Sequence, residues 1–233
     1  MLRSAAESWG TEHLRLTIYG RDVVIKALVV TLVLDVAALI IPIELIKIIL
    51  LFISVVLITF TLFFFRDPLR KLPGNLKEND IISPADGKVM LIEEIEESEF
   101  LKSKAKLIGI FLSPFNVHVN RIPVSGKVGF YKYIKGEYIV AFDHKSSERN
   151  ERTIIGIEAK KFRVLFKQIA GFVARRIVSG LREGSIVNIG DKFGMIKFGS
   201  RVDVIIPANS IINVSVNQKV TGGETILAEV LVA

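Results

Sequence analysis

The sequence predicts a mostly β protein of the α+β class, in which a barrel-sandwich-like β domain follows an N-terminal transmembrane helical hairpin. Two apolar runs of helical length lie close together before residue 66. Beyond that residue, short segments rich in β-branched and aromatic residues alternate with turn residues. In addition, the stretches 184–196 and 214–226 both place a β-branched run, a Gly-containing turn and a second run in succession.

The composition favours a protein that is partly embedded in lipid. The 233 residues fit one compact domain plus an accessory segment, and 50% of them are hydrophobic, which is high for a purely soluble chain. The net charge of +7 suits either nucleic acid or an anionic membrane surface. We expect the membrane and no nucleic acid, because lipid also explains the apolar excess. The absence of cysteine excludes disulfides and thiolate nucleophiles.

The hairpin is predicted from two runs, 23–41 and 45–65, that carry few charges. Each is about 20 residues long, which is enough for a helix to cross a hydrocarbon core of about 30 Å. A short connection containing Pro42 separates them. We therefore divide the chain into a polar segment (1–22), a transmembrane helical hairpin (23–65) and a catalytic β-rich domain (66–233).

Basic residues on both sides of the hairpin predict its orientation. Arg15 and Arg21 precede the first run, whereas Arg66, Arg70 and Lys71 follow the second. Positively charged flanks stay on the cytoplasmic side, so both termini are expected there. The predicted location is the cell membrane, with the catalytic domain on its cytoplasmic side. A re-entrant hairpin is the alternative.

The part after residue 66 reads as an all-β domain with little helix. Strands are predicted at Lys88–Ile92, Leu107–Leu112, Lys127–Tyr133, Thr153–Glu158 and Val202–Ile206. One helix is predicted, at Gln168–Ser179. The two similar stretches resemble the half-units of lipoyl- and biotinyl-type barrel-sandwich folds, although neither carries a lysine in the setting that those carrier proteins modify.

Gly199 and Ser200 form the candidate reaction centre. A Gly-Ser pair between two strands is on its own most simply a turn or a bulge. A more specific interpretation is chemical: the Ser200 hydroxyl can attack the carbonyl of Gly199, where the missing side chain leaves the carbonyl accessible. The amide then becomes an ester, β-elimination breaks the chain, and loss of ammonia leaves a pyruvoyl group at the new N-terminus.

Four short motifs surround this centre in a fixed order. They are SPADGKV at 83–89, FNVHVNRIP at 115–123, NER at 150–152 and FGSRVD at 198–203. Together with FRDP at 65–68, they make the chain resemble the short-form phosphatidylserine decarboxylases of prokaryotes. Each motif alone is weak, whereas four in this order, with Gly-Ser near the C-terminus, are highly specific.

The resemblance implies a self-cleaving proenzyme, a carboxy-lyase. Cleavage would fall between Gly199 and Ser200, giving a large chain (1–199) and a small chain (200–233). The implied cofactor is pyruvate, as a covalent pyruvoyl group derived from Ser200. It would form a Schiff base with the amine of a membrane phospholipid and convert phosphatidylserine to phosphatidylethanolamine. No metal is implied.

Further site residues follow from the same motifs. His118 is the candidate base for the Ser200 hydroxyl and later the proton donor, because a neutral imidazole suits both tasks near pH 7. Asp86 would orient that imidazole, as the third member of a Ser–His–Asp arrangement. Asn120, Arg121 and Arg152 are the candidate substrate-binding residues, since a guanidinium can hold a phosphate through two hydrogen bonds.

One position departs from the family pattern. The long-form enzymes carry two histidines in the segment that matches 116–123, whereas this chain has only His118 there, with Arg121 at the other position. Either His118 performs both roles or another group replaces the second histidine. His144 is a conceivable replacement, although its polar neighbours fit an exposed loop better.

Two alternative functions remain at this point. The chain could decarboxylate archaetidylserine, an ether lipid with the same head group, because the reacting centre does not sense the lipid tails. It could instead be a non-catalytic, membrane-tethered barrel-sandwich adaptor, which would not explain Ser200 and His118 in their motifs. Assembly into a homo-oligomer is left open.

Overall fold

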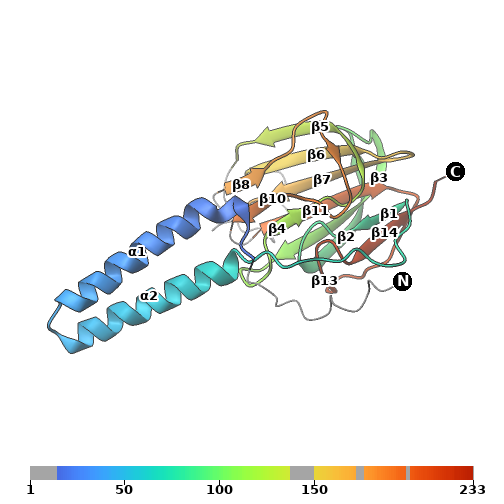
Figure 1. The fold of residues 1–233 in the computed structure, drawn as a ribbon. Coiled ribbons are helices and arrows are strands. Elements are labelled where there is room, and N and C mark those ends of the chain that lie inside the picture. Colours follow the sequence, from blue (N-terminus) through green and yellow to red (C-terminus); the bar gives the residue numbers. More distant parts are fainter. Residues whose placement is uncertain (1–14, 137–149, 172–175, 198–199, 233) are drawn as a thin grey trace, which may run out of the picture. The chain divides into compact units, whose positions relative to one another are not determined.

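The computed structural model describes residues 15–136, 150–171, 176–197 and 200–232. The chain divides into two compact units, Met1–Pro68 and Leu69–Ala233. The first contains two long helices and the second is built from strands (Figure 1). The predicted fold class, a mostly β chain with an N-terminal helical hairpin, is confirmed.

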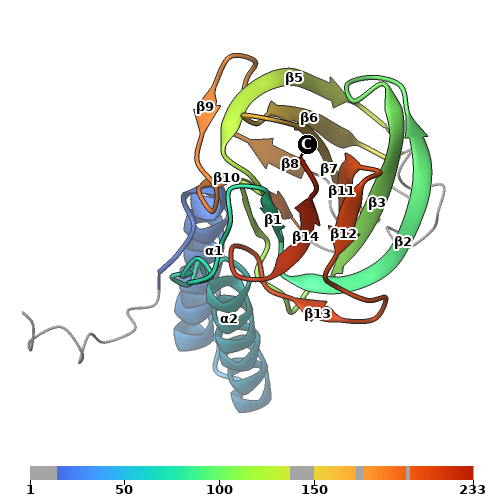
Figure 2. The same cartoon turned by 90° about the vertical axis from the view of Figure 1, so that its right-hand side faces the viewer.

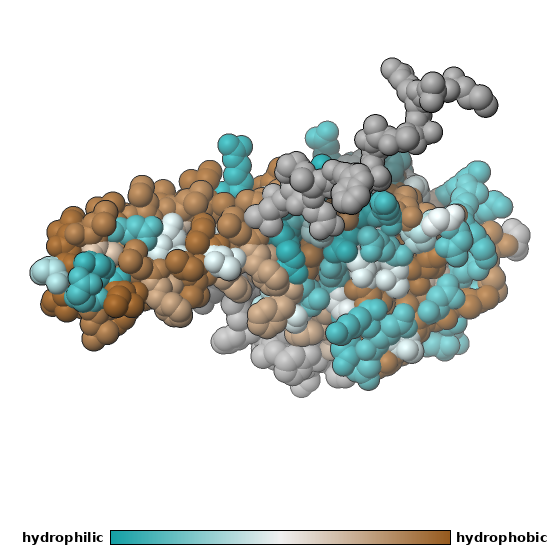
Figure 3. All heavy atoms as spheres, turned by 60° about the horizontal axis from the view of Figure 1, so that its bottom comes forward, coloured by the Kyte–Doolittle hydropathy of each residue, from teal (hydrophilic) through white to brown (hydrophobic). Residues whose placement is uncertain are grey.

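The hairpin consists of a 3₁₀ turn, η1 (Ile18–Gly20), and two helices, α1 (Arg21–Ile40) and α2 (Glu44–Phe64). Helix α1 ends before Pro42, where Ile41 is extended with φ −74° and ψ 124°, as expected for a residue that precedes proline. Both helices are long and apolar enough to cross a membrane, judged by length and composition. Apolar side chains cover most of the hairpin surface (Figure 3).

Small residues lie where the two helices pack together. The buried positions include Ala27, Thr31 and Ala38 of α1 and Ser54 and Thr61 of α2. The Thr31 and Thr61 hydroxyls donate to carbonyls of their own helices, at 3.0 Å and 2.7 Å. Small side chains let helix backbones approach closely, which is the usual way that helices pack within lipid.

The β unit is dominated by an eight-stranded antiparallel sheet. Its order is β13-β2-β3-β11-β7-β6-β5-β9. The strands are β2 (Gly87–Glu97), β3 (Ser103–Leu112), β5 (Gly126–Ile134), β6 (Arg152–Glu158), β7 (Arg163–Ile169), β9 (Ile186–Val187), β11 (Ser200–Pro207) and β13 (Lys219–Val220). All five strands predicted from the sequence lie within this sheet.

Two three-stranded sheets complete the unit. One has the order β1-β14-β12 and the other the order β4-β10-β8. Their bounds are β1 (Asp80–Ile82), β4 (Val119–Arg121), β8 (Arg176–Ser179), β10 (Lys192–Lys197), β12 (Ser210–Ile212) and β14 (Ile226–Val230). The large sheet curls round, and β1, β14 and β12 are seen in the middle of the curl in Figure 2.

The curled sheet has an apolar cluster on each face. The inner cluster includes Leu112 of β3, Phe166 of β7 and Val202 of β11. A smaller second cluster includes Leu107, Leu165 and Ile205 from the same strands. Because side chains alternate between faces along a strand, β11 is buried on both sides. This central, doubly covered strand begins at Ser200.

The predicted helix at Gln168–Ser179 is wrong. Strand β7 extends to Ile169, and β8 begins at Arg176 and pairs with β10. Its first two residues and its last four therefore belong to strands of two different sheets. The physical reason is tertiary: pairing of Ile177 and Val178 with β10 outweighs a local helical pattern, since β-branched side chains fit a pleated surface well.

The two similar stretches follow the same backbone course. Gly184 and Asn217 have φ of 84° and 75°, and six positions later Gly190 and Gly223 both have φ of 83°. Each stretch forms a two-residue strand, β9 or β13, that pairs with the first residues of a long strand, β5 or β2.

This repetition extends to the long strands themselves. Gly184 N–H donates to the Val128 carbonyl and Asn217 N–H to the Val89 carbonyl, both at 2.8 Å. The segments before these valines read PADGKV (84–89) and PVSGKV (123–128). The β unit therefore contains a repeated structural unit, in which residues 86 and 125 occupy matching positions.

Candidate active site

Ser200 is the first residue of β11, a central strand of the curled sheet. It pairs with Leu112, the last residue of β3. Its side chain shares a face with Val202, which belongs to the inner cluster. Ser200 is fully buried, and its hydroxyl has no hydrogen-bond partner among the described residues. A buried hydroxyl without a partner is costly and is therefore a feature to explain.

A tight turn brings His118 back toward the same region. The turn follows Leu112, and the Asn116 side chain accepts hydrogen bonds from the Ser113 backbone N–H at 2.9 Å and the Ser113 hydroxyl at 2.8 Å. The His118 carbonyl then accepts from the Ile196 N–H of β10 at 3.4 Å. His118 is thus linked through one connection to Leu112, the partner of Ser200, and through the other to β10, which precedes Ser200.

The surroundings of His118 select one tautomer of the neutral ring. The imidazole is fully buried, and its Nδ1 lies 2.9 Å from the Asn116 carbonyl oxygen. A carbonyl can only accept, so Nδ1 carries the proton. In the neutral ring Nε2 then has the lone pair and can accept a proton from a nucleophile.

Asn120 belongs to a chain of buried polar side chains. Gln168 donates from Nε2 to Asn120 Oδ1 at 2.8 Å, and the Thr153 hydroxyl donates to Gln168 Oε1 at 2.7 Å. The chain crosses from β4 to β7 and β6. Asn120 Nδ2 is buried and has no hydrogen-bond partner within the described part of the protein.

Both carboxylate oxygens of Asp86 accept hydrogen bonds. Its Oδ2 accepts from Arg70 at 2.6 Å, and its Oδ1 accepts from the Gly222 backbone N–H at 2.8 Å. The matching residue Ser125 accepts in the same way from the Ile189 N–H, at 2.9 Å. One oxygen of Asp86 therefore caps a turn, as Ser125 does, and the second oxygen is held by an ion pair.

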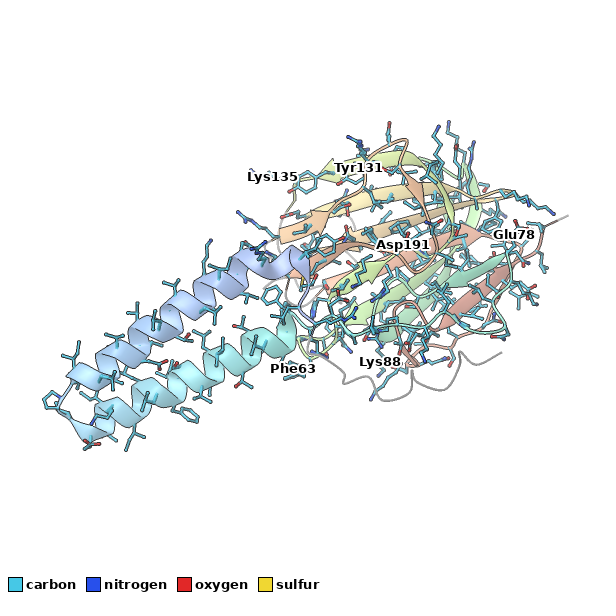
Figure 4. All side chains as sticks on the ribbon, viewed as in Figure 1. Phe63, Glu78, Lys88, Tyr131, Lys135 and Asp191 are labelled. Carbon is cyan, nitrogen blue, oxygen red and sulfur yellow. The ribbon has the colours of Figure 1, made fainter. Side chains whose placement is uncertain are left out.

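The two arginines predicted to bind substrate make contacts within the protein. Arg121 donates to the Gly190 carbonyl at 3.1 Å, next to Asp191 in the turn that leads into β10 (Figure 4). Arg152 donates to the Asn150 carbonyl at 3.2 Å. Arg121 is buried, whereas Arg152 is half-buried.

The NER motif forms a frame around the end of β7. Asn150 donates from its side chain to the Ala170 carbonyl at 2.7 Å, and the Ala170 N–H donates to the Glu151 carbonyl at 2.9 Å. Because Ile169 pairs with Arg201, this frame fixes the backbone beside Ser200. Asn150 and Glu151 therefore support the site, a role that the sequence did not predict.

Two predicted positions, Gly199 and His144, lie outside the described residues. Within the described ranges, no three His, Asp or Glu side chains cluster in a way that could hold a metal ion. A surface cavity of about 670 Å³ opens between the start of β5 and residues 159–162. None of the predicted site residues lines it.

Fold and site together define a class: a β-rich enzyme with a buried serine and a buried histidine in its interior, carrying two apolar N-terminal helices that could span a membrane. The chain belongs to the phosphatidylserine decarboxylase family, since the family model described as "Phosphatidylserine decarboxylase" matches residues 57–228. The family predicted from the motifs is confirmed, and so is the prediction that the chain is an enzyme of this family.

Curated relatives agree with this assignment. A phosphatidylserine decarboxylase proenzyme of Chlorobium limicola is 46% identical over 91% of this chain and 99% of the relative. A proenzyme of the same name from Prosthecochloris aestuarii is 45% identical over 90% and 95%. That of Cytophaga hutchinsonii is 49% identical over 77% and 81%. The similarity therefore covers nearly the full length of the first two relatives and about four fifths of the third.

Sequence reasoning missed Gln168 and Thr153, which complete the polar chain at Asn120. The available signal was alternation: both are polar residues at inward positions of strands that are otherwise apolar there. Gln168 was instead assigned to a helix, which hid its partner on β6.

Proposed function

We propose that this chain is a self-cleaving proenzyme that decarboxylates phosphatidylserine to phosphatidylethanolamine, with Ser200 as the precursor of a pyruvoyl group. One observation carries the proposal. The Ser200 hydroxyl is fully buried and has no hydrogen-bond partner among the described residues, in an interior that also holds His118. A hydroxyl kept in this state is suited to react, because no hydrogen bond competes for it.

Self-cleavage begins with proton transfer. The Ser200 hydroxyl gives its proton to Nε2 of His118, and its oxygen bonds to the carbonyl carbon of residue 199. The carbon–nitrogen bond of the peptide breaks, and the Ser200 nitrogen takes the proton back, which leaves an ester. Loss of the Ser200 α-proton then expels residue 199 as a carboxylate. Addition of water and release of ammonia complete the change, giving a large chain (1–199) and a small chain (200–233).

The buried interior around Ser200 fits a pyruvoyl group, since it holds an unpartnered polar atom within an apolar cluster. A pyruvoyl group supplies a ketone that accepts the electrons released when carbon dioxide leaves the substrate. His118 is the proposed donor of the proton that replaces the carboxylate. We further propose that Asn120, Arg121 and Arg152 contact the head group and that Asp86 supports the imidazole.

The substrate is proposed to be phosphatidylserine rather than archaetidylserine, because the curated relatives carry the former name. A non-catalytic adaptor is not supported, since the family is one of enzymes. The lipid would be reached from a membrane anchor made of α1 and α2, with both termini on the cytoplasmic side, as the basic flanks predict.

Replacement of Ser200 by alanine tests the proposal. The wild-type chain should run as two bands on a denaturing gel, and the mass of the small chain should show an N-terminus that lacks an amine. The Ser200→Ala chain should remain whole and release no carbon dioxide. Ser210→Ala is the matched control, because Ser210 is also buried on a strand but donates to the Pro207 carbonyl. An unbroken wild-type chain with no carbonyl that borohydride can trap would overturn the proposal.

A further inference from the structure

The polar chain that ends at Asn120 has a free donor in the interior of the β unit. Asn120 is fully buried, and Gln168 occupies its Oδ1 at 2.8 Å. Its Nδ2 has no hydrogen-bond partner among the described residues. Within the same described ranges, Ser200 Oγ is a second buried side-chain atom without a partner.

The chain fixes which end of the Asn120 amide is free. The Thr153 hydroxyl donates to Gln168 Oε1 at 2.7 Å, so the amide nitrogen of Gln168 faces Asn120. Because that nitrogen only donates, it requires the oxygen of Asn120 as its partner. The N–H groups of Asn120 are therefore turned away from Gln168. Each member of the chain specifies the orientation of the next.

A hydrogen bond and strand register together connect this donor to the reaction centre. The Asn120 amide binds Gln168, and Gln168 pairs with Val202, which is two residues from Ser200 and shares its face of β11. His118 lies two residues before Asn120, just before β4 begins at Val119. Asn120 therefore follows the histidine closely in the chain and contacts the strand next to the one that begins at Ser200.

We infer that the Asn120 amide is the hydrogen-bond donor for the oxyanion that forms on the carbonyl of residue 199 during self-cleavage, and that Gln168 and Thr153 are positioning residues that hold it. This inference rests on the proposed function and deepens it. When Ser200 Oγ bonds to the carbonyl carbon, the carbonyl oxygen gains the negative charge. A fixed N–H in a buried interior stabilises that charge without reorganisation.

The direct test is Asn120→Asp, which keeps the shape of the side chain and removes the donor. Cleavage of newly made full-length chain should be slower by about 10²- to 10³-fold, followed as small-chain formation on a gel. The control is Asn79→Asp. Asn79 also donates from its side chain to a strand carbonyl, that of Val230 at 2.8 Å, but lies just before β1 and outside the polar chain. This control should cleave at the wild-type rate.

A second variant tests the orientation without touching Asn120. A carboxylate in Gln168→Glu cannot donate to Asn120 Oδ1 and would accept from Nδ2, which turns the amide around. Cleavage should slow as much as in Asn120→Asp. Lowering the pH protonates the new carboxyl and restores a donor, so the ratio of wild-type to variant rates should fall.

The other end of the polar chain is tested at Thr153. Thr153→Val should slow cleavage because it removes the hydroxyl that orients Gln168. Thr153→Ser should cleave at close to the wild-type rate, because serine retains the hydroxyl.

The outcomes separate the inference from the proposed function. If the wild-type chain never cleaves, both fall together. If the wild-type chain cleaves and Asn120→Asp cleaves equally fast, only the inference is overturned. A Gln168→Glu rate ratio that does not change with pH also overturns it, because a purely structural defect would give that result. Slow cleavage in both variants, with a ratio that falls at low pH and unchanged melting temperatures, would support it.

Discussion

At the scale of single residues, the orientation of His118 comes from the chain two positions before it. The Asn116 carbonyl accepts from Nδ1, and the Asn116 side chain is in turn fixed by Ser113. A backbone carbonyl held by a tight turn can set a tautomer as well as a carboxylate can, although it adds no full negative charge. The imidazole is thus prepared to accept a proton at Nε2.

Two variants test whether His118 acts alone or whether a second histidine takes over one of its proposed roles. His118→Ala should slow self-cleavage by about 10²- to 10⁴-fold, the usual contribution of a general base. His144→Ala should leave self-cleavage unchanged. The decarboxylation rate of this variant shows whether His144 acts in the later step, decarboxylation of the lipid. Both rates can be followed on gels and by release of labelled carbon dioxide. Wild-type cleavage in His118→Ala would exclude it as the base.

Arg201 and Asp203 form a buried ion pair on the second face of β11, where they are 3% and 0% exposed. Gly109 makes room for it, because a Cβ at that position would lie 3.3 Å from Arg201 Nε. Such a pair contributes little net stability, but loss of one partner leaves a buried charge.

Asp203→Leu should therefore destabilise the fold by about 3–5 kcal/mol. The double variant Arg201→Met with Asp203→Leu should cost much less, because no charge remains buried. Thermal melting followed by circular dichroism, in a Ser200→Ala background that prevents cleavage, measures both. Equal destabilisation by the single and double variants would contradict this account.

At the scale of elements, the turn after β2 depends on one carboxylate. Glu97 accepts from the backbone N–H groups of Glu99 at 2.8 Å, Phe100 at 2.9 Å and Leu101 at 2.5 Å. Phe100 and Leu101 in turn pack on the second apolar cluster. Burial opposes ionisation of Glu97, but the backbone hydrogen bonds outweigh it and lower its pKa below the ordinary value.

A lowered pKa in the folded state gives a definite pH dependence. The stabilisation is fully present above the ordinary glutamate pKa of about 4.3 and is lost as the pH falls through the folded value. Glu97→Gln should lower the free energy of unfolding by about 1–2 kcal/mol at pH 7. The difference in stability from wild type should shrink as the pH falls below the ordinary glutamate pKa and Glu97 becomes protonated. Melting at several pH values tests this, with the exposed Glu96→Gln as the control. A difference that does not change with pH would contradict it.

At the scale of the whole molecule, the helical hairpin and the β unit have separate tasks. The β unit, Leu69–Ala233, is compact by itself and contains every described residue that we assign to the chemistry. The hairpin exposes apolar side chains along both helices and suits an anchor in lipid. A tether raises the local concentration of head groups near the site.

Deletion of residues 1–65 should leave self-cleavage intact and weaken turnover on bilayers by about tenfold or more. The comparison uses liposomes for the tethered reaction and dispersed short-chain lipid as the control, on which both proteins should be equally active. Equal activity on liposomes would show that the hairpin does not supply the substrate.

The sequence by itself determined the class of each element and the family. Apolar runs of helical length predicted α1 and α2, and β-branched runs predicted the five strands, because these signals depend on residues that are near in sequence. The order of four short motifs was enough to identify the family, since each motif specifies several residue types at fixed spacing.

Only the tertiary structure decided which distant residues meet. Strand pairing with β10 made Arg176–Ser179 a strand rather than a helix. Register between β6 and β7 joined Thr153 to Gln168, and packing of a second sheet against them joined Gln168 to Asn120. The repeated unit gave Asp86 its turn contact. These partners depend on sheet order and curvature, which arise from the burial of the whole inner cluster at once. No local pattern in the chain contains that information.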